Sequence, residues 1–257
     1  MEMSWSILAL VCPLIFLSGL VDSIAGGGGL ISLPSYIMVG LPAHMAYGTN
    51  KFAACLGTSF SVARFMKNKK VHIKSAIFFV FAAIIGSYIG VRVALALDEK
   101  YLKICLLVLL PIMTIFIMTR KNFGEVDKHK ILSDKKIIIL SILSGLVIGA
   151  YDGFFGPGTG SFYILIYTGV MGFTLTTASG NAKIVNLASN VTAMITFTLS
   201  GKVFFPIAIP AALCGILGNW IGSGLAIKNG AKVIKPVFVA VLILLFLKIS
   251  MDLFSFI

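Results

Sequence analysis

Four charged side chains of this 257-residue chain lie within or beside long uncharged stretches, where a charge is costly and marks a functional site. They are Asp22, Lys51, Asp152 and Lys183. A lysine can supply positive charge to an anion, and an aspartate can hold that lysine in place or take up a proton. The two sets of charges therefore predict a polar site for a small anion inside an apolar protein.

A glycine-rich stretch follows each aspartate, "SIAGGGG" after Asp22 and "GFFGPGTG" after Asp152. Glycine lets a helix stop and restart, and the restarted helix presents unpaired N–H groups and a positive dipole end that attract anions. Small residues that let helices pack closely are the simpler explanation of either stretch alone. Because the stretches occupy equivalent places, we favour two helix breaks whose N–H groups cradle the ligand. The glycines concerned are Gly26, Gly27, Gly28, Gly29, Gly156, Gly158 and Gly160.

Amide side chains near the two lysines are candidate hydrogen-bond donors to the anion. Lys183, Asn186 and Asn190 follow the i, i+3, i+7 spacing that places residues on one face of a helix. This alignment suits the lining of a cavity, although a hydrogen-bonded seam between two helices has the same pattern. The candidate donors are Asn50, Asn181, Asn186 and Asn190.

Both kinds of charge also have structural alternatives. Lys51 and Lys183 lie near the expected starts of helices, so each could extend to the lipid headgroups. Asp22 and Asp152 could cap free N–H groups at the breaks or form structural salt bridges with the lysines.

The composition is that of a polytopic membrane protein. Hydrophobic residues make up 58% of the chain and charged residues 12%, about half the share in a soluble domain. Ten apolar segments are expected, and several approach the length of about 20 residues that crosses a bilayer as a helix. They cover residues 4–24, 29–40, 50–63, 74–97, 101–119, 137–153, 160–171, 182–200, 204–227 and 233–254.

Several function classes are disfavoured by what the sequence contains. The first apolar segment has neither the basic start nor the cleavage site of a signal peptide, so we expect it to remain as a span. The four cysteines lie in apolar segments without metal-type spacing, and no hydrolase, metalloprotease or P-loop motif occurs. We therefore expect no enzymatic activity, no cofactor and no bound metal. The net charge of +12 is concentrated in short polar segments, which argues against nucleic acid as a partner.

The chain repeats itself at an offset of 132 residues. "AYGTNK" aligns with "ASGNAK", which pairs Lys51 with Lys183, and "IIGSYIG" aligns with "ILGNWIG". Upstream the offset becomes 130 and pairs Asp22 with Asp152. Each half then has five apolar segments, of which the second is short. The expected organisation is a first repeat over 1–119, a basic cytoplasmic linker over 120–136 and a second repeat over 137–257.

The distribution of basic residues predicts that the two repeats are inverted. Most lysines and arginines fall in 64–74, 120–136 and 228–235, which the positive-inside rule places in the cytoplasm. The loop equivalent to 64–74, near Gly201, contains only Lys202, so equivalent loops lie on opposite faces. Ten segments then put both termini outside. If the short segments only dip into the membrane and return, eight spans result and the repeats are parallel.

The motifs resemble those of the TauE/SafE family of bacterial anion exporters. The resemblance rests on "DSIAGGGGLISLP" with "AYGTNK" in the first half and "DGFFGPGTGSF" with "ASGNAKIVNLASN" in the second, and it covers nearly the whole chain. It implies secondary transport of a small anion such as sulfite, a sulfonate or a related organic acid. It also implies a site between the repeats, at the glycine motifs and the helices of Lys51 and Lys183. The substrate itself is not implied.

The sequence thus predicts an all-α carrier for a small anion in the bacterial cytoplasmic membrane, with a proton or Na⁺ as possible coupling ion. Replacing Lys51 or Lys183 with alanine is expected to abolish transport and leave folded protein in the membrane. Two alternatives remain: a proton or cation channel centred on Asp22 and Asp152, and an intramembrane enzyme that uses them as an acid pair. The direction of transport and the oligomeric state are not predicted.

Overall fold

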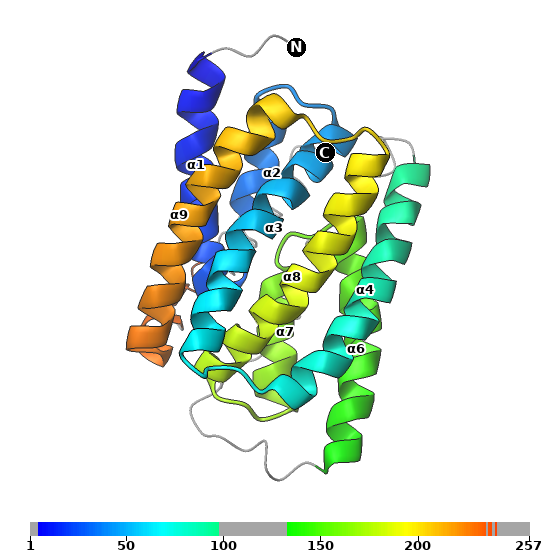
Figure 1. The fold of residues 1–257 in the computed structure, drawn as a ribbon, viewed down its shortest axis with the longest axis vertical. Helices are drawn as coiled ribbons and strands as arrows, with labels where there is room; N and C mark the ends of the chain where they lie inside the picture. The colour runs from blue at the N-terminus through cyan, green and yellow to red at the C-terminus, as the bar shows by residue number, and fades with distance from the viewer. Residues whose placement is uncertain (1–4, 98–132, 235, 238–239, 241–257) are drawn as a thin grey trace, which may run out of the picture.

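The computed structural model describes residues 5–97 and 133–240, apart from 235, 238 and 239 (Figure 1). Within these residues the secondary structure is helical, which confirms the predicted fold class. Most of the predicted linker, segment 101–119 and most of segment 233–254 lie outside the described residues, so the boundaries of the repeats stay a prediction. The elements are α1 (Trp5–Ala25), α2 (Gly29–Met38), α3 (Ala43–Lys67), α4 (Ile73–Ala96), α6 (Asp134–Phe154), α7 (Thr159–Leu165), the π-helical turn η2 (Ile166–Val170), α8 (Leu175–Leu199) and α9 (Phe205–Asn229).

Four of the described helices, α1, α4, α6 and α9, are long and apolar enough to cross a membrane. Their outward faces carry large exposed apolar side chains, such as Phe81 on α4, Val147 on α6 and Leu213 on α9. α3 and α8 have 25 residues each, about 37 Å of helix, but they are more polar because they carry the candidate site.

α3 and α8 begin seven residues before the segments expected from hydrophobicity, so the prediction that Lys51 and Lys183 start these helices is wrong. α3 begins after Pro42 and α8 after Thr174, whose hydroxyl accepts a hydrogen bond from the Thr177 N–H. The small and polar residues of both first turns hide them from a hydrophobicity criterion. Each lysine instead lies in the third turn of its helix.

Equivalent helices of the two repeats run in opposite directions (Figure 1). α1 starts at the end of the bundle near the N-terminus, whereas its counterpart α6 starts at the other end, and the same holds for α3 with α8 and α4 with α9. Neighbouring helices contact one another in the order α1, α9, α3, α8, α4, α6, which is symmetric about the α3–α8 contact. The described helices thus have the inverted arrangement, and the parallel alternative is wrong.

The repeated motif "IIGSYIG"/"ILGNWIG" serves helix packing. Gly86 and Gly90 of α4 lie against the backbone of α6, and Gly218 and Gly222 of α9 lie against the backbone of α1. A Cβ atom at any of the four would collide with a carbonyl oxygen of the facing helix or a neighbouring atom. Each repeat therefore packs its fourth helix against the first helix of the other repeat, through small residues.

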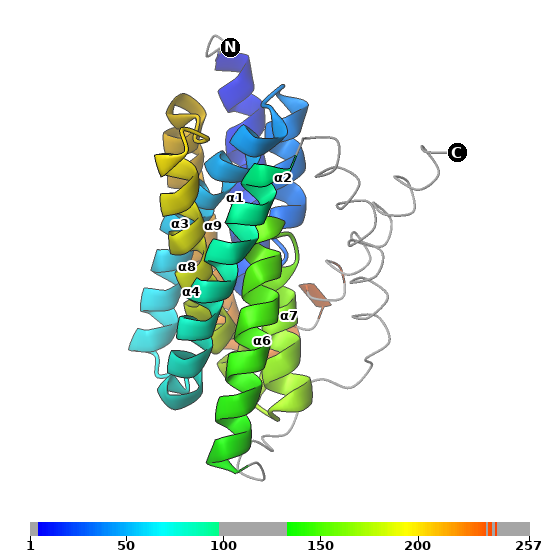
Figure 2. The same ribbon diagram turned by 90° about the vertical axis from the view of Figure 1, so that its right-hand side faces the viewer.

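The two glycine-rich stretches form the predicted breaks, and the breaks touch. Gly26 (φ +80°) ends α1, and Gly156 (φ +92°) follows α6. A Cβ atom on Gly26 would collide with the backbone of Gly160. The hydroxyl of Ser161 also donates to the Ala25 carbonyl across the contact, at 2.7 Å. The short helices α2 and α7 leave the breaks in opposite directions on the same side of the bundle (Figure 2).

Candidate functional site

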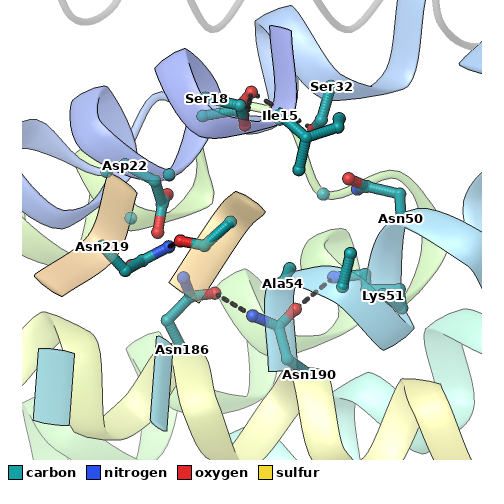
Figure 3. Close-up of a pocket in the computed structure, with 18 of the residues that line it drawn as sticks. Ile15, Ser18, Asp22, Ser32, Asn50, Lys51, Ala54, Asn186, Asn190 and Asn219 are labelled. Atoms are coloured by element: carbon teal, nitrogen blue, oxygen red, sulfur yellow. Dashed lines mark hydrogen bonds between the residues drawn. The ribbon is translucent and has the colours of Figure 1, made fainter. Parts of the chain in front are cut away.

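A cavity lies beside the contact of the two breaks, between α1, α2, α3, α8 and α9 (Figure 3). It contains about 540 Å³ of space not filled by atoms, including its open mouth. The cavity volume that admits water is about 40 Å³, which is room for a few water molecules or a small ion. The described residues of its polar and glycine lining are Ser18, Gly19, Asp22, Gly26, Gly28, Gly29, Ser32, Asn50, Lys51, Asp152, Gly156, Gly160, Asn186, Asn190, Gly215 and Asn219.

Lys51 supplies the positive charge of the cavity lining and is held by the second repeat. Its Nζ lies 2.9 Å from Oδ2 of Asp152 and donates to Oδ1 of Asn190 at 3.0 Å. Ser189 donates a further hydrogen bond to the same Asp152 oxygen, at 2.5 Å. The Lys51 side chain is only 3% exposed, so it does not extend to the headgroups.

The second ion pair is the symmetry counterpart of the first. Nζ of Lys183 lies 2.7 Å from Oδ2 of Asp22, so here the lysine comes from the second repeat and the aspartate from the first. The Lys183 side chain is fully buried, does not reach the headgroups and does not line the cavity. Asp22 is 17% exposed and lines the cavity in place of Lys183. Both pairs therefore join a lysine of one repeat to an aspartate of the other, but only the lysine of the first pair lines the cavity.

Three of the four predicted amide donors line the cavity. Asn190 donates to Oδ1 of Asn186 at 3.4 Å, so the Asn186 carbonyl oxygen is occupied and its NH₂ group remains for a ligand. Asn50 lies on the opposite wall, next to Lys51 (Figure 3). The i, i+3, i+7 pattern of α8 thus brings Asn186 and Asn190 to the cavity, while Lys183 faces Asp22.

The structure places Asn181 outside the cavity, at the start of α4. Its Oδ1 accepts a hydrogen bond from the His72 N–H at 2.8 Å, and its Nδ2 donates to Ser75 at 3.3 Å. In the other repeat the hydroxyl of Thr49 accepts from the Phe204 N–H at 3.0 Å, before α9. The two positions are aligned in the repeat, so both serve to cap the fourth helix of the opposite repeat.

Five of the seven predicted glycines line the cavity, and Gly27 and Gly158 do not. Gly28 and Gly29 form the start of α2, whose first N–H groups have no partner within their helix. Gly158 (φ +82°) precedes α7 and serves the turn.

Three polar residues of the lining were not predicted: Ser18, Ser32 and Asn219. Asn219 accepts from Ser61 at 2.9 Å and donates to the Gly215 carbonyl at 3.0 Å. Its signal in the sequence is an amide within the apolar motif "ILGNWIG". The serines carry no distinguishing signal, because serine is common in membrane helices at packing contacts.

Three polar positions of this lining have apolar counterparts in the other half. Ser18 aligns with Ile148, Ser32 with Phe162 and Asn50 with Ala182. At these three positions, larger or apolar side chains replace the polar groups found on the side of Lys51. The repeats contribute unequally, since Lys51 lines the cavity and Lys183 does not.

Comparisons with known proteins agree with this architecture. The family described as "Sulfite exporter TauE/SafE" matches residues 11–249. The chain is 32% identical to "Probable membrane transporter protein ORF9" of Sinorhizobium sp over 98% of its length and 95% of that protein. It is 30% identical to a "Probable membrane transporter protein" of Haemophilus influenzae, covering 98% of both chains.

It is also 31% identical to "Probable membrane transporter protein YfcA" of Escherichia coli K12, over 92% of this chain and 87% of that protein. No solved structure matches the chain significantly. The family match covers both repeats, both breaks and both ion pairs. The chain therefore belongs to the TauE/SafE sulfite exporter family of membrane transporters.

Proposed function

We propose that this protein is a secondary transporter for a small anion, such as sulfite, a sulfonate or a related organic anion, and that the cavity beside Lys51 is its binding site. The observation that carries the proposal is the position of Lys51. Its ammonium group is buried in the cavity wall at the level of the two helix breaks, and a lysine in an apolar interior binds an anion strongly once its own partner is neutralised or displaced.

Three kinds of group are proposed to contact the anion: a charged side chain, amide side chains and backbone N–H groups. Lys51 would bind the negative charge, and Asn50 and Asn186 would donate side-chain hydrogen bonds. Asn190 would orient Lys51. The N–H groups at Gly28 and Gly29 would add the positive end of the α2 dipole. Asp152 and Asp22 would position the two lysines or take up a coupling proton.

We infer that the protein lies in the bacterial cytoplasmic membrane with its N-terminus outside. The basic turn between α3 and α4, the start of α6 and the end of α9 share one end of the bundle, opposite the start of α1 (Figure 1). Lys67, Lys74, Lys135 and Lys228 lie at that end. The positive-inside rule assigns it to the cytoplasm.

Flux of radiolabelled anions into proteoliposomes tests the proposal. Sulfite, methanesulfonate and succinate are supplied separately to wild type and to Lys51→Ala. Saturable uptake of at least one anion, lost in the variant, is expected. If purified, folded protein moves none of the three, the proposed substrate class is wrong; if Lys51→Ala transports normally, the proposed site is wrong.

A proton or cation channel is the second candidate, because Asp22 is the more exposed of the charged side chains in the cavity, at 17% against 3% for Lys51. Charge selectivity separates the two. A channel gives non-saturating currents carried by cations, whereas the proposed carrier gives saturable anion flux. The enzyme alternative is weaker, because each aspartate is bound to its own lysine and the two do not share a proton as an acid pair.

A further inference from the structure

We propose that each monovalent anion crosses together with one proton, in an electroneutral step, and that Asp152 carries this proton. The inference rests on the proposed function, since it concerns the same cavity. It follows from three features: the sum of the buried charges, the unequal position of the two ion pairs, and the hydrogen bonding of the carbonyl groups at both breaks.

Among the described residues, the two buried ion pairs at the centre of the bundle sum to zero charge. Asp22 and Asp152 balance Lys51 and Lys183 in two ion pairs of 2.7 and 2.9 Å. An anion that enters this neutral site adds an uncompensated negative charge in a low-dielectric interior, which is strongly unfavourable. One positive charge that enters with the anion restores neutrality.

A proton on Asp152 supplies this positive charge next to the cavity. Protonation of Asp152 leaves the ammonium of Lys51 without a counter-charge, and Lys51 lines the cavity, so the anion takes the place of the carboxylate. Protonation of Asp22 would instead leave Lys183 uncompensated, and Lys183 is fully buried and does not line the cavity. The anion cannot reach it. The proton and the anion therefore bind together at the Lys51–Asp152 pair.

Within the described part of the chain, one cation pairs with Asp152. Lys51 from α3 is the cation that faces it. The titratable side chains of Tyr163 from α7 and of Tyr151 on its own helix also lie within electrostatic reach. α8 contributes the Ser189 hydroxyl, and Ser87 of α4 donates to the Ser189 carbonyl.

Sodium is disfavoured as the coupling ion because side-chain hydroxyls cover carbonyl oxygens at the breaks. In transporters, the carbonyls of unwound helix segments are the usual ligands of Na⁺. Here Gly28 O accepts from Ser18 at 2.8 Å, and Ala25 O accepts from Ser161 at 2.7 Å. At the second break, Tyr151 donates to the Pro157 carbonyl at 2.8 Å.

Two further hydroxyls complete this cover. Thr159 donates to Gly156 O at 2.6 Å, and Ser179 donates to Ile24 O at 3.0 Å. A cation at either break would share each of these carbonyl oxygens with a hydroxyl donor that already occupies one of its two lone pairs.

The experiment measures proton movement with anion uptake in proteoliposomes that contain a trapped pH dye. Methanesulfonate is the probe, because it stays ionised at all working pH values and carries no proton of its own. Inward flux is expected to acidify the lumen by about one proton per anion, independently of Na⁺. A K⁺ gradient with valinomycin is expected to leave the initial rate unchanged.

Asp152→Asn imitates the protonated side chain and keeps the hydrogen-bonding shape. This variant is expected to bind the anion without pH dependence, to exchange labelled for unlabelled anion, and to lose the luminal acidification. Asp152→Glu is expected to restore it. Ser141→Ala, a buried and unpartnered hydroxyl on the same helix, is the matched control with unchanged coupling.

Uptake that requires Na⁺, or that follows the valinomycin potential without acidification, overturns the inference but leaves the anion carrier intact. Acidification that persists in Asp152→Asn overturns the assignment of the proton to Asp152. If sulfite alone is transported, the same comparison is made with sulfite, because the proton that sulfite itself carries is the same for wild type and Asp152→Asn. Absence of flux for every anion contradicts the proposed function itself.

Discussion

Lys51 and Asp152 come from opposite repeats and meet in a 2.9 Å ion pair that is almost completely buried. The inverted counterpart, Lys183 with Asp22, closes the same contact in the other direction at 2.7 Å. Each aspartate sits just before a helix break, and each lysine lies in the third turn of a crossing helix. The two pairs therefore fasten both breaks to the central helices α3 and α8.

Removing the lysine of either ion pair is predicted to destabilise the protein more than neutralising both partners. Lys51→Ala or Lys183→Ala leaves a carboxylate buried without its counter-charge, a loss of about 3–5 kcal/mol for a buried pair. Lys183→Gln with Asp22→Asn replaces the second pair with neutral amides, so the free energy of unfolding is expected to recover. Thermal unfolding in detergent and anion flux are the two measurements.

The same neutral replacement at the first pair separates stability from binding. Lys51→Gln with Asp152→Asn should also recover thermal stability, but flux should stay absent because the cavity has lost its ammonium group. By contrast, Lys183→Gln with Asp22→Asn should regain flux. Equal flux from both double variants would show that the anion does not use Lys51.

Asn50 of the first repeat and Asn181 of the second are predicted to have different roles. Asn50→Ala removes a donor from the cavity and should raise KM for the anion by up to about tenfold. Asn181→Ala removes the cap of α4 and should lower stability by about 1 kcal/mol without changing KM. The measurements are concentration-dependent flux and the melting temperature. A raised KM in Asn181→Ala would show that Asn181 contributes to substrate binding.

The contact between the breaks is predicted to require glycine at position 26. Gly26→Ala forces a left-handed residue, a strain of about 1–2 kcal/mol, and drives a methyl group into the backbone of Gly160. Gly40→Ala is the matched control, because Gly40 has a similar φ of +86° but no atom within 4 Å of the added Cβ. Only the first variant should lose monodisperse protein in size-exclusion chromatography. Equal behaviour of the two would mean that the breaks do not depend on this contact.

The sequence by itself determined the architecture and the charged residues of the site. Helices in a membrane must be long and apolar, so their approximate positions could be read from hydrophobicity, and the inversion followed from basic residues in equivalent loops. Asp22 and Asp152 were identifiable because a charge within an apolar segment has few purposes other than function or pairing. The hydrophobicity and charge of a segment depend on whether lipid or water surrounds that segment, so they can be read from the segment's own residues.

Only the tertiary structure decided which groups share the cavity. The repeat alignment treats Lys51 and Lys183 as equal, yet the side chains around them differ in bulk and polarity, and only Lys51 lines the cavity. Asn181 looks like Asn186 in the sequence, but the crossing of α8 with α4 turns it into a helix cap. Such differences arise from contacts between distant segments, which hydrophobicity and spacing along one helix do not encode.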